Sequence, residues 1–140
     1  SVYENLSFDE IKPLLPAIHE AILNPSPSGI MFANAIQDAG LKLFAKHRIE
    51  EGIELAANYA RTQKKHGSQK RIVTVMKILE SYGTHAKRAI PSLEKTVYYF
   101  KNEEQDFPKK LSLEKAKIVE QTIAIIKAST DEPKLIKINI

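Results

Sequence analysis

The strongest constraint on the fold of this chain is the way in which turn-forming segments interrupt a nearly continuous helical pattern. Apolar residues recur at helical spacing along six stretches of the 140-residue sequence. Between these stretches lie segments rich in residues that break helices, among them "NPSPSG", "KKHGS" and "NEEQDFP". The last residues, "PKLIKINI", show some of the alternation of a strand. The sequence therefore predicts an all-α domain of six helices, at about 7–23, 29–47, 48–65, 68–82, 84–101 and 111–129.

Local signals mark where several of these helices begin and end. Ser7 and Glu10 have the spacing of a capping box, in which each side chain bonds the backbone of the other residue. Gly67 suits the left-handed conformation that closes a helix, and Ser68 suits the cap of the next one. Gly40 stands alone inside the second predicted helix, where the missing side chain indicates a close approach of two helices.

A second group of signals surrounds the start of the fifth helix, in "YGTHAKRAIPSL". Gly83 can close the fourth helix with a positive φ, and Thr84 can cap the fifth through its side-chain oxygen. Pro91 then falls inside the fifth helix, where it removes one backbone hydrogen bond. We therefore expect a kink near residues 87–89.

The same periodicity predicts which side chains of each helix face the core. The residues expected to form the apolar stripes include Ile36, Leu43 and Phe44 in the second helix, Ile49, Ile53, Ala56, Ala57 and Ala60 in the third, Ile72, Val75, Met76 and Leu79 in the fourth, Ala86, Ile90, Leu93, Val97 and Phe100 in the fifth, and Ala116, Val119, Ile123 and Ile126 in the sixth.

The sequence also repeats itself at a regular interval. "PAI" at Pro16 and "PSL" at Pro91 occupy the same place in the first and fifth helices, and "GIEL" brings Gly52 to the matching point of the third. These points lie 36 and 39 residues apart, so the chain divides into three consecutive helix pairs. A helix pair of this length cannot bury its apolar face alone, and stacking supplies the core. An α-solenoid of about three pairs is therefore expected, with the acidic first helix and the tail as its caps.

The segment "YGTHAKRAIPSLEK" resembles the junction between HEAT repeats, in which a kinked first helix carries a proline. Pro16 and Pro91 fit that pattern, whereas Gly52 departs from it. "PSGIMFANAIQDAGLKLFAKHRIEEGIELAANYAR" and "SQKRIVTVMKILESYGTHAKRAIPSL" also resemble the C-terminal helical-repeat region of large multidomain bacterial proteins. The resemblance implies a right-handed HEAT-like solenoid over residues 1–140, part of a longer and often exported protein. It provides no catalytic residues that can be transferred to this chain.

Composition narrows the class of protein further. With 43% hydrophobic and 27% charged residues, the chain has the balance of an ordinary globular domain. No apolar run approaches the roughly 20 residues that cross a bilayer, so no membrane span is predicted. The absence of cysteine excludes disulfides and thiolate metal sites. Because the sequence begins at Ser1 rather than Met, we expect a processed or excised piece, and the compartment stays open.

The net charge of +4 is unevenly distributed along the chain. Residues 1–40 carry a net charge of −4, residues 41–101 carry +8, and the remainder is neutral. An anionic partner would therefore be attracted to the middle of the molecule. The predicted partner-binding residues form a basic edge where the third helix meets the fourth, and two further basic residues lie beyond that edge in the fifth helix. The edge consists of Arg61, Lys64, Lys65, Lys70 and Arg71, and the further residues are Lys87 and Arg88.

Patterns typical of enzymes or metal sites are incomplete. His19 and Glu20 begin like a helical zinc motif, but the position four residues after His19 is Leu23. Glu50 and Glu54 belong to a helical surface cluster rather than to converging carboxylates. We therefore predict no catalytic residue, no metal and no cofactor. In "TVYYF" the core stripe leaves one tyrosine to the surface, and Tyr99 is a candidate aromatic contact.

Three functions remain compatible with the sequence. The first is a non-catalytic protein-interaction or scaffold module that binds a protein, or a sister domain of the same chain, through its curved or basic surface. The partner would then carry an acidic surface. The second is a nucleic-acid-binding HEAT-like domain, which the basic edge favours and the modest net charge disfavours. The third, an auxiliary domain of a secreted hydrolase, rests on the resemblance alone.

Overall fold

The computed structural model describes residues 5–24, 30–63 and 67–139. Within these ranges the chain is all-α, as the sequence predicts, and its extended pairing is an isolated bridge between Ile49 and Ile136. The elements are α1 (Phe8–Ile11), the 3-10 helix η1 (Lys12–Leu14), α2 (Leu15–Leu23), α3 (Ile30–Lys46), α4 (Glu51–Arg61), α5 (Ser68–Glu80), the 3-10 helix η3 (Gly83–Ala89), α6 (Ile90–Asn102) and α7 (Lys109–Ala128).

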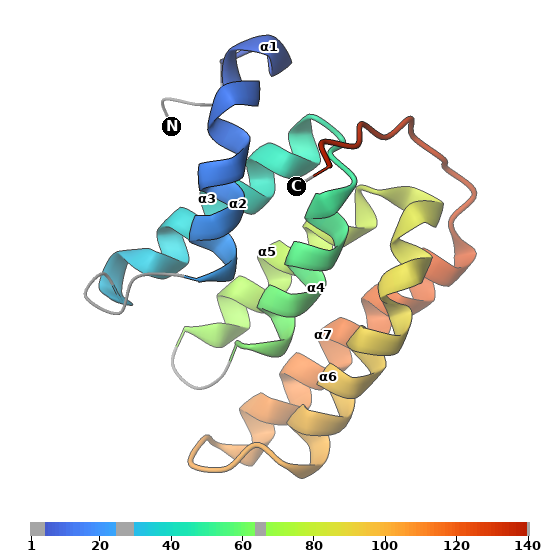
Figure 1. Ribbon diagram of the computed structural model, residues 1–140. Coiled ribbons are helices and arrows are strands. Elements are labelled where there is room, and N and C mark those ends of the chain that lie inside the picture. The colour runs from blue at the N-terminus through green and yellow to red at the C-terminus, as the bar shows by residue number, and fades with distance from the viewer. Residues whose placement is uncertain (1–4, 25–29, 64–66, 140) are drawn as a thin grey trace.

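Consecutive helices form three pairs, which stack beside one another (Figure 1). The pairs are α2 with α3, α4 with α5, and α6 with α7. Neighbouring pairs meet through α2, α4 and α6 on one side and through α3, α5 and α7 on the other. The molecule therefore has two layers of helices, with the core between them. The right-handed sense of the stack and its relationship to HEAT repeats stay predictions.

The repeat seen in the sequence has a structural counterpart at the start of each first helix. Pro16 is the second residue of α2, Gly52 is the second residue of α4, and Pro91 is the second residue of α6. A proline at the start of a helix removes an N–H group that has no partner within the helix. The three positions therefore share one place in the fold, although the second carries a different residue.

The predicted kink inside the fifth helix is wrong, and so is the predicted cap at Thr84. The chain runs as a 3-10 helix from Gly83 to Ala89, and the α-helix begins only at Ile90. Pro91 thus lies in the first turn of α6, where it breaks no hydrogen bond. The N-cap of η3 is Tyr82, and the Thr84 amide instead donates to the carbonyl of Asp131, 2.8 Å away.

Close packing explains the glycine of the second pair. A Cβ atom at Gly52 would lie 2.9 Å from the Cβ of Phe44 and would collide with the hydroxyl of Tyr82. That hydroxyl is held in place because it donates to the carbonyl of Ile49 over 2.8 Å. Any side chain at position 52 would therefore displace a buried tyrosine.

Other local predictions are confirmed. The Ser7 side chain accepts from the Glu10 amide at 3.2 Å, and the Glu10 carboxylate accepts from the Ser7 amide at 3.1 Å. Gly83 has a φ of 61°, as expected. Gly67 also has a positive φ, of 74°, but it is the N-cap of α5 and does not close the preceding helix, since α4 ends at Arg61 and Ser68 is already the first residue of α5. At Gly40 a Cβ atom would lie 2.8 Å from the Cδ1 of Ile22, so α2 and α3 approach closely there.

The core contains nearly all of the predicted apolar stripes. The stripes of the third, fourth and sixth predicted helices are buried throughout, and in the fifth Ile90 is partly buried. The second predicted helix is the exception, because Ile36 is 54% exposed while the polar Gln37 is 8% exposed. Near its beginning, α3 therefore buries Gln37 in place of the expected Ile36, whereas Leu43 and Phe44 are buried as predicted.

The tail does not cover the last helix pair as expected. Residues 131–139, here called the strap, cross from the end of α7 toward the beginnings of α4 and η3 (Figure 1). The Glu50 amide donates to Ile136, whose own amide donates to Arg48, both over 2.8 Å. The Glu51 carboxylate accepts from the Asn139 amide at 2.8 Å. The strap therefore ties the third pair to the second.

Candidate interaction surfaces

An apolar groove lies on the outer side of the first helix pair. Its volume is about 390 Å³, and α4, α5, α6 and α7 contribute none of its described lining. Two large side chains in it are exposed to solvent, Ile36 at 54% and Leu14 at 41%. This first-pair groove is lined by Leu14, Ala17, Ile18, Ala21, Ile36, Ala39, Gly40 and Leu43.

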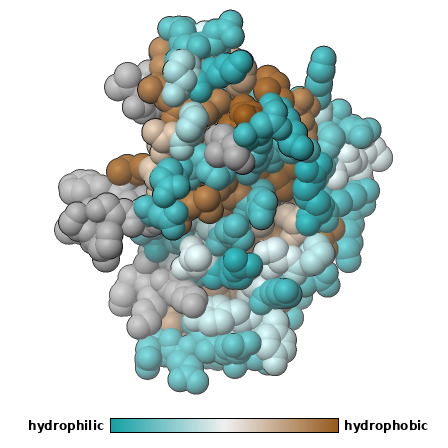
Figure 2. Space-filling model, viewed as in Figure 1, coloured by the Kyte–Doolittle hydropathy of each residue, from teal (hydrophilic) through white to brown (hydrophobic). Residues whose placement is uncertain are grey.

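The corresponding groove on the last helix pair has a different character. It lies between α6 and α7 with a volume of about 510 Å³. An ion pair between Lys101 and Glu120, 3.1 Å long, joins the two helices across it. The surface over α6 and α7 is mainly hydrophilic in Figure 2. This last-pair groove is lined by Glu94, Val97, Tyr98, Lys101, Asn102, Glu120, Ile123, Ala124 and Lys127.

The predicted basic edge is divided between two places. Arg61 ends α4 and donates to the side chain of Asn58 at 3.0 Å. Lys70 and Arg71 lie in the first turn of α5, with Lys70 exposed and Arg71 half-buried. These three residues therefore lie near the connection between α4 and α5. Lys64 and Lys65 fall outside the described residues.

The remaining two basic residues lie at the other end of α4. Lys87 and Arg88 are exposed residues of η3, and Arg88 forms an ion pair with Glu50 over 2.9 Å. This bond lowers the pKa of the Glu50 carboxyl group. Glu50 immediately precedes α4, whereas Arg61 ends it, so the two groups are separated by the helix length of about 16 Å. The structure does not bring all the described basic residues into one patch.

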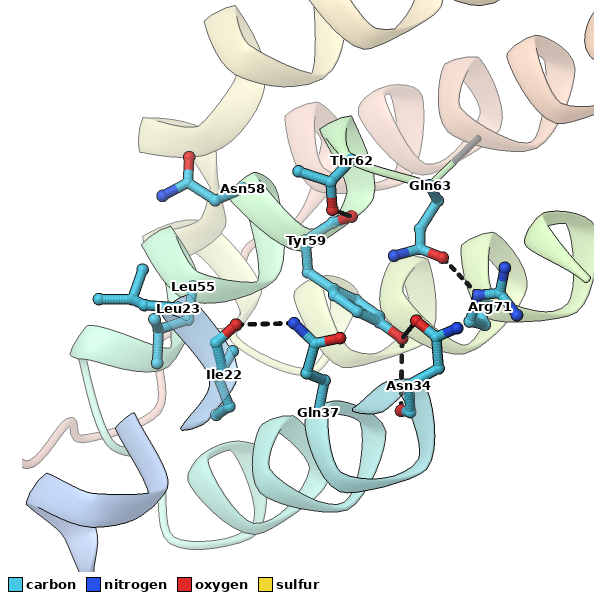
Figure 3. Close-up of a pocket in the computed structure, with 10 residues that line it drawn as sticks. All are labelled: Ile22, Leu23, Asn34, Gln37, Leu55, Asn58, Tyr59, Thr62, Gln63 and Arg71. Atoms are coloured by element: carbon cyan, nitrogen blue, oxygen red, sulfur yellow. Dashed lines mark hydrogen bonds between the residues drawn. The ribbon is translucent and has the colours of Figure 1, made fainter. Parts of the chain in front are cut away.

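A polar hollow of about 310 Å³ opens where α2, α3, α4 and α5 meet (Figure 3). The sequence does not reveal this hollow, because its polar residues come from three separate segments. Gln37 was the one visible signal, because it is a polar residue with a helical spacing of four from the buried Leu41. The hollow is lined by Ile22, Leu23, Asn34, Gln37, Leu55, Asn58, Tyr59, Thr62, Gln63 and Arg71.

Hydrogen bonds fix several of these side chains. Gln37 donates to the carbonyl of Ile22 at 2.7 Å, and Arg71 donates to the side-chain oxygen of Gln63. The Tyr59 hydroxyl lies 3.3 Å from the side-chain oxygen of Asn34 and 3.4 Å from its carbonyl oxygen. Burial raises the pKa of Tyr59. The tyrosine therefore stays neutral and donates its proton.

A buried charged cluster joins α5 to α7 and to the loop before α7. The side chains of Lys115 and Glu104 are both fully buried, and their charged atoms are 2.9 Å apart. Lys115 also donates to Ser68 at 2.8 Å, and its ammonium group lies 4.3 Å and 4.4 Å from the ring centres of Phe100 and Phe107. Burial lowers the pKa of Lys115, and the Glu104 carboxylate opposes this shift. Ser68, expected as a helix cap, thus serves as an acceptor for a buried lysine.

One tyrosine of "TVYYF" is exposed and the other is partly buried, as the apolar stripe predicts. The exposed one is Tyr98 rather than the predicted Tyr99. Tyr98 is 58% exposed and lines the last-pair groove. Tyr99 is half-buried, and its ring contacts that of Phe100 at a centroid distance of 5.7 Å. Partial burial raises the pKa of Tyr99. An aromatic contact with a partner would involve Tyr98 more readily than Tyr99.

Searches for metal-ligating groups and membrane segments return nothing within the described part of the chain. Across residues 5–24, 30–63 and 67–139, no three His, Asp or Glu side chains are grouped so that they could hold a metal ion. In the same ranges, none of the helices combines the length and the apolar character needed to cross a membrane.

Comparisons of the chain with protein-family models, with curated proteins and with solved structures find no match.

Proposed function

We propose that this chain is a helical-repeat interaction module whose first helix pair stacks against a helix pair of another domain or protein. The observation that supports this function is the difference between the two ends of the stack. One end carries the apolar first-pair groove, while the other carries the last-pair groove, in which charged residues accompany the apolar ones and an ion pair joins the two helices. A repeat stack needs a polar outer face at each end that meets water.

The occupant follows from the way in which this molecule already packs. Each helix pair buries its apolar side against the next pair, first helix on first helix and second on second. The first-pair groove would continue the same contact one step further, because its lining comes from both helices of one pair. Burial of Ile36 and Leu14 by another amphipathic helix pair would contribute about 25 cal/mol for each Å² of apolar surface removed from water.

The test uses a second copy of the chain as the available helix pair. Because the chain has no cysteine, a photo-crosslinking label can be attached at Ala39→Cys in the first-pair groove or at Ala124→Cys in the last-pair groove. We expect intermolecular crosslinks from the first label and few from the second, at concentrations between about 0.1 and 1 mM.

Two charge substitutions serve as matched controls. Ile36→Lys should abolish the crosslinks and the concentration-dependent rise in sedimentation coefficient. Ile125→Lys, at another isoleucine that is 51% exposed, should leave both unchanged. Equal crosslinking from both labels, or crosslinks and association that survive Ile36→Lys, would contradict the proposal.

A further inference from the structure

The carboxamides of the polar hollow are held in defined orientations. Gln37 uses its amide nitrogen to bond the carbonyl of Ile22, so its oxygen is directed elsewhere. Gln63 uses its oxygen to accept from Arg71, so its NH₂ group is directed away from that guanidinium. Figure 3 shows both amides beside the ring of Tyr59. The hollow therefore presents hydrogen-bonding groups whose directions are set before any ligand arrives.

Part of this hydrogen-bonding capacity is unused. Among the described residues, no group bonds the oxygen of Gln37 or the amide nitrogens of Gln63 and Asn34. Gln37 and Gln63 are only 8% and 5% exposed. None of these three atoms is among the described buried side-chain atoms that lack a partner, so they face the open hollow, where a ligand can bond them in place of water.

The unused groups define the chemistry of that occupant. Two NH₂ groups require acceptor oxygens, and the Gln37 oxygen requires a donor. A segment with two peptide groups provides two acceptor oxygens together with N–H donors. At the other side of the hollow, Leu23 and Leu55 offer apolar surface. We propose that the polar hollow binds an extended polypeptide segment through its main-chain amides, with an aliphatic side chain against Leu23 and Leu55.

The charges around the hollow favour a neutral main chain over a carboxylate. Arg71 lines the hollow, and Asp38 lies close enough to Tyr59 to act on the same hydroxyl with the opposite sign. A ligand carboxylate attracted by the guanidinium would be repelled by Asp38. A peptide group carries no net charge, so Arg71 does not attract it as an anion and Asp38 does not repel it. The volume of about 310 Å³ suits one or two residues of such a segment.

This site is separate from the first-pair groove. The two surfaces share no lining residue, so either proposal can fail while the other stands.

The experiment is a titration followed by ¹H–¹⁵N correlation spectra. The probe is N-acetyl-leucine N-methylamide, which has two peptide groups and one aliphatic side chain. The comparison ligand is N-acetyl-leucine, which replaces one peptide group by a carboxylate. We expect saturable shifts at Gln37, Tyr59 and Gln63 with the probe, and at least fivefold weaker binding of the carboxylate.

Asn34→Leu is the variant that tests the hydrogen bonds. Its fold should survive, because the Tyr59 hydroxyl keeps the carbonyl of residue 34 as an acceptor. Loss of one amide donor should weaken probe binding about fivefold to tenfold. Gln121→Leu, on the exposed face of α7, should leave it unchanged. Thermal unfolding of both variants confirms that each is folded.

Three results would overturn the proposal. They are no saturable shift at the hollow up to about 50 mM probe, equal binding of the probe by Asn34→Leu and the unaltered chain, and tighter binding of the carboxylate ligand. The last would reassign the hollow to an anionic ligand.

Discussion

Gly83 is the single residue on which both a helix end and the strap depend. Its φ of 61° belongs to the left-handed region, which costs a residue with a side chain about 1–2 kcal/mol. A Cβ atom there would also collide with the backbone carbonyl of Asp131 in the strap. We expect Gly83→Ala to lower the free energy of unfolding by clearly more than the backbone cost alone, as measured by urea unfolding.

Gly67→Ala provides the matched control for that substitution. Gly67 has a similar φ of 74°, but the nearest obstacle to a Cβ atom is the flexible end of the Arg71 side chain. This variant should therefore show the backbone cost of about 1–2 kcal/mol and little else. Equal losses in the two variants would mean that the strap does not restrict position 83.

Tyr82 makes the stability of the fold sensitive to alkaline pH. Burial raises the pKa of this tyrosine, whose hydroxyl donates to Ile49. Because the folded pKa lies above the unfolded value, the contribution of Tyr82 is complete below pH of about 10 and is lost as the pH rises above it. Each such group lowers the free energy of unfolding by about 1.4 kcal/mol per pH unit in that window.

Tyr82→Phe should remove the part of the alkaline loss of stability that the ionisation of Tyr82 causes. We expect the free energy of unfolding of the variant to fall less steeply between pH of about 10 and 12 than that of the unaltered chain, by one proton equivalent. Tyr98→Phe, at a residue that is 58% exposed, should retain the original slope. Identical slopes in the Tyr82 variant and the unaltered chain would rule out this origin of the pH dependence.

At the scale of elements, Lys115 attaches α7 to Ser68 of α5 and to Glu104 of the loop before α7. Removing one member of a fully buried ion pair leaves an uncompensated charge, which typically costs about 3–5 kcal/mol. We therefore expect Lys115→Met to destabilise the fold by about that amount. The double variant with Glu104→Gln should recover part of the loss, because the remaining charge is gone. Equilibrium urea unfolding of both variants measures the coupling.

An exposed ion pair in the same two-helix unit supplies the control. Lys101 and Glu120 also join α6 to α7, but their side chains are 43% and 48% exposed. Surface pairs of this kind contribute at most about 1 kcal/mol. If Lys101→Met cost as much as Lys115→Met, burial would not be the reason for the cost.

Element boundaries show where sequence reasoning succeeds and where it stops. Breakers and periodicity locate the helices because those signals are local. The start of α6 was misplaced because Pro91 permits two local solutions, a kinked helix or a 3-10 segment ahead of a new helix. The strap adds a long-range contact at this junction, because its Asp131 carbonyl accepts from the Thr84 amide, and no local pattern predicts that bond.

The interaction surfaces were less predictable than the helices for the same reason. Lys115 lies one residue from the predicted inward stripe of α7, and its burial depends on Glu104 in a preceding loop. The hollow requires Gln37 and Gln63 to meet across two helix pairs. Ile36 is exposed while Gln37 is buried, because at that turn of α3 the neighbouring helices lie on the side of Gln37, which periodicity does not reveal. Each depends on contacts between segments remote in sequence.

At the scale of the whole molecule, the strap links the last helix pair to the middle one. Removal of residues 131–140 would break the backbone bonds of Glu50 and Thr84 to the strap and uncover the part of the core against which Leu135 and Ile138 pack. We expect a loss of stability on the order of 3 kcal/mol. Hydrogen exchange should show lost protection at the amides of Glu50 and Thr84.

The amide of Gly52 serves as an internal control in that experiment. It donates to the carbonyl of Ile49 over 3.0 Å and has no bond to the strap. In the truncated chain the Gly52 amide should therefore still exchange slowly, through global unfolding only. Equal loss of protection at all three amides would indicate that the truncated chain has unfolded rather than lost one contact.

The strap also sets the order of events during folding. Within and between neighbouring helix pairs most partners lie close together in the sequence, so those contacts form at small entropic cost. The bond from Ile138 to Glu51 joins residues 87 positions apart, and the loop it closes contains two complete helix pairs. Closing such a loop becomes favourable only after those pairs have shortened the distance between its ends. The stack should therefore assemble first, and the strap should lock it last.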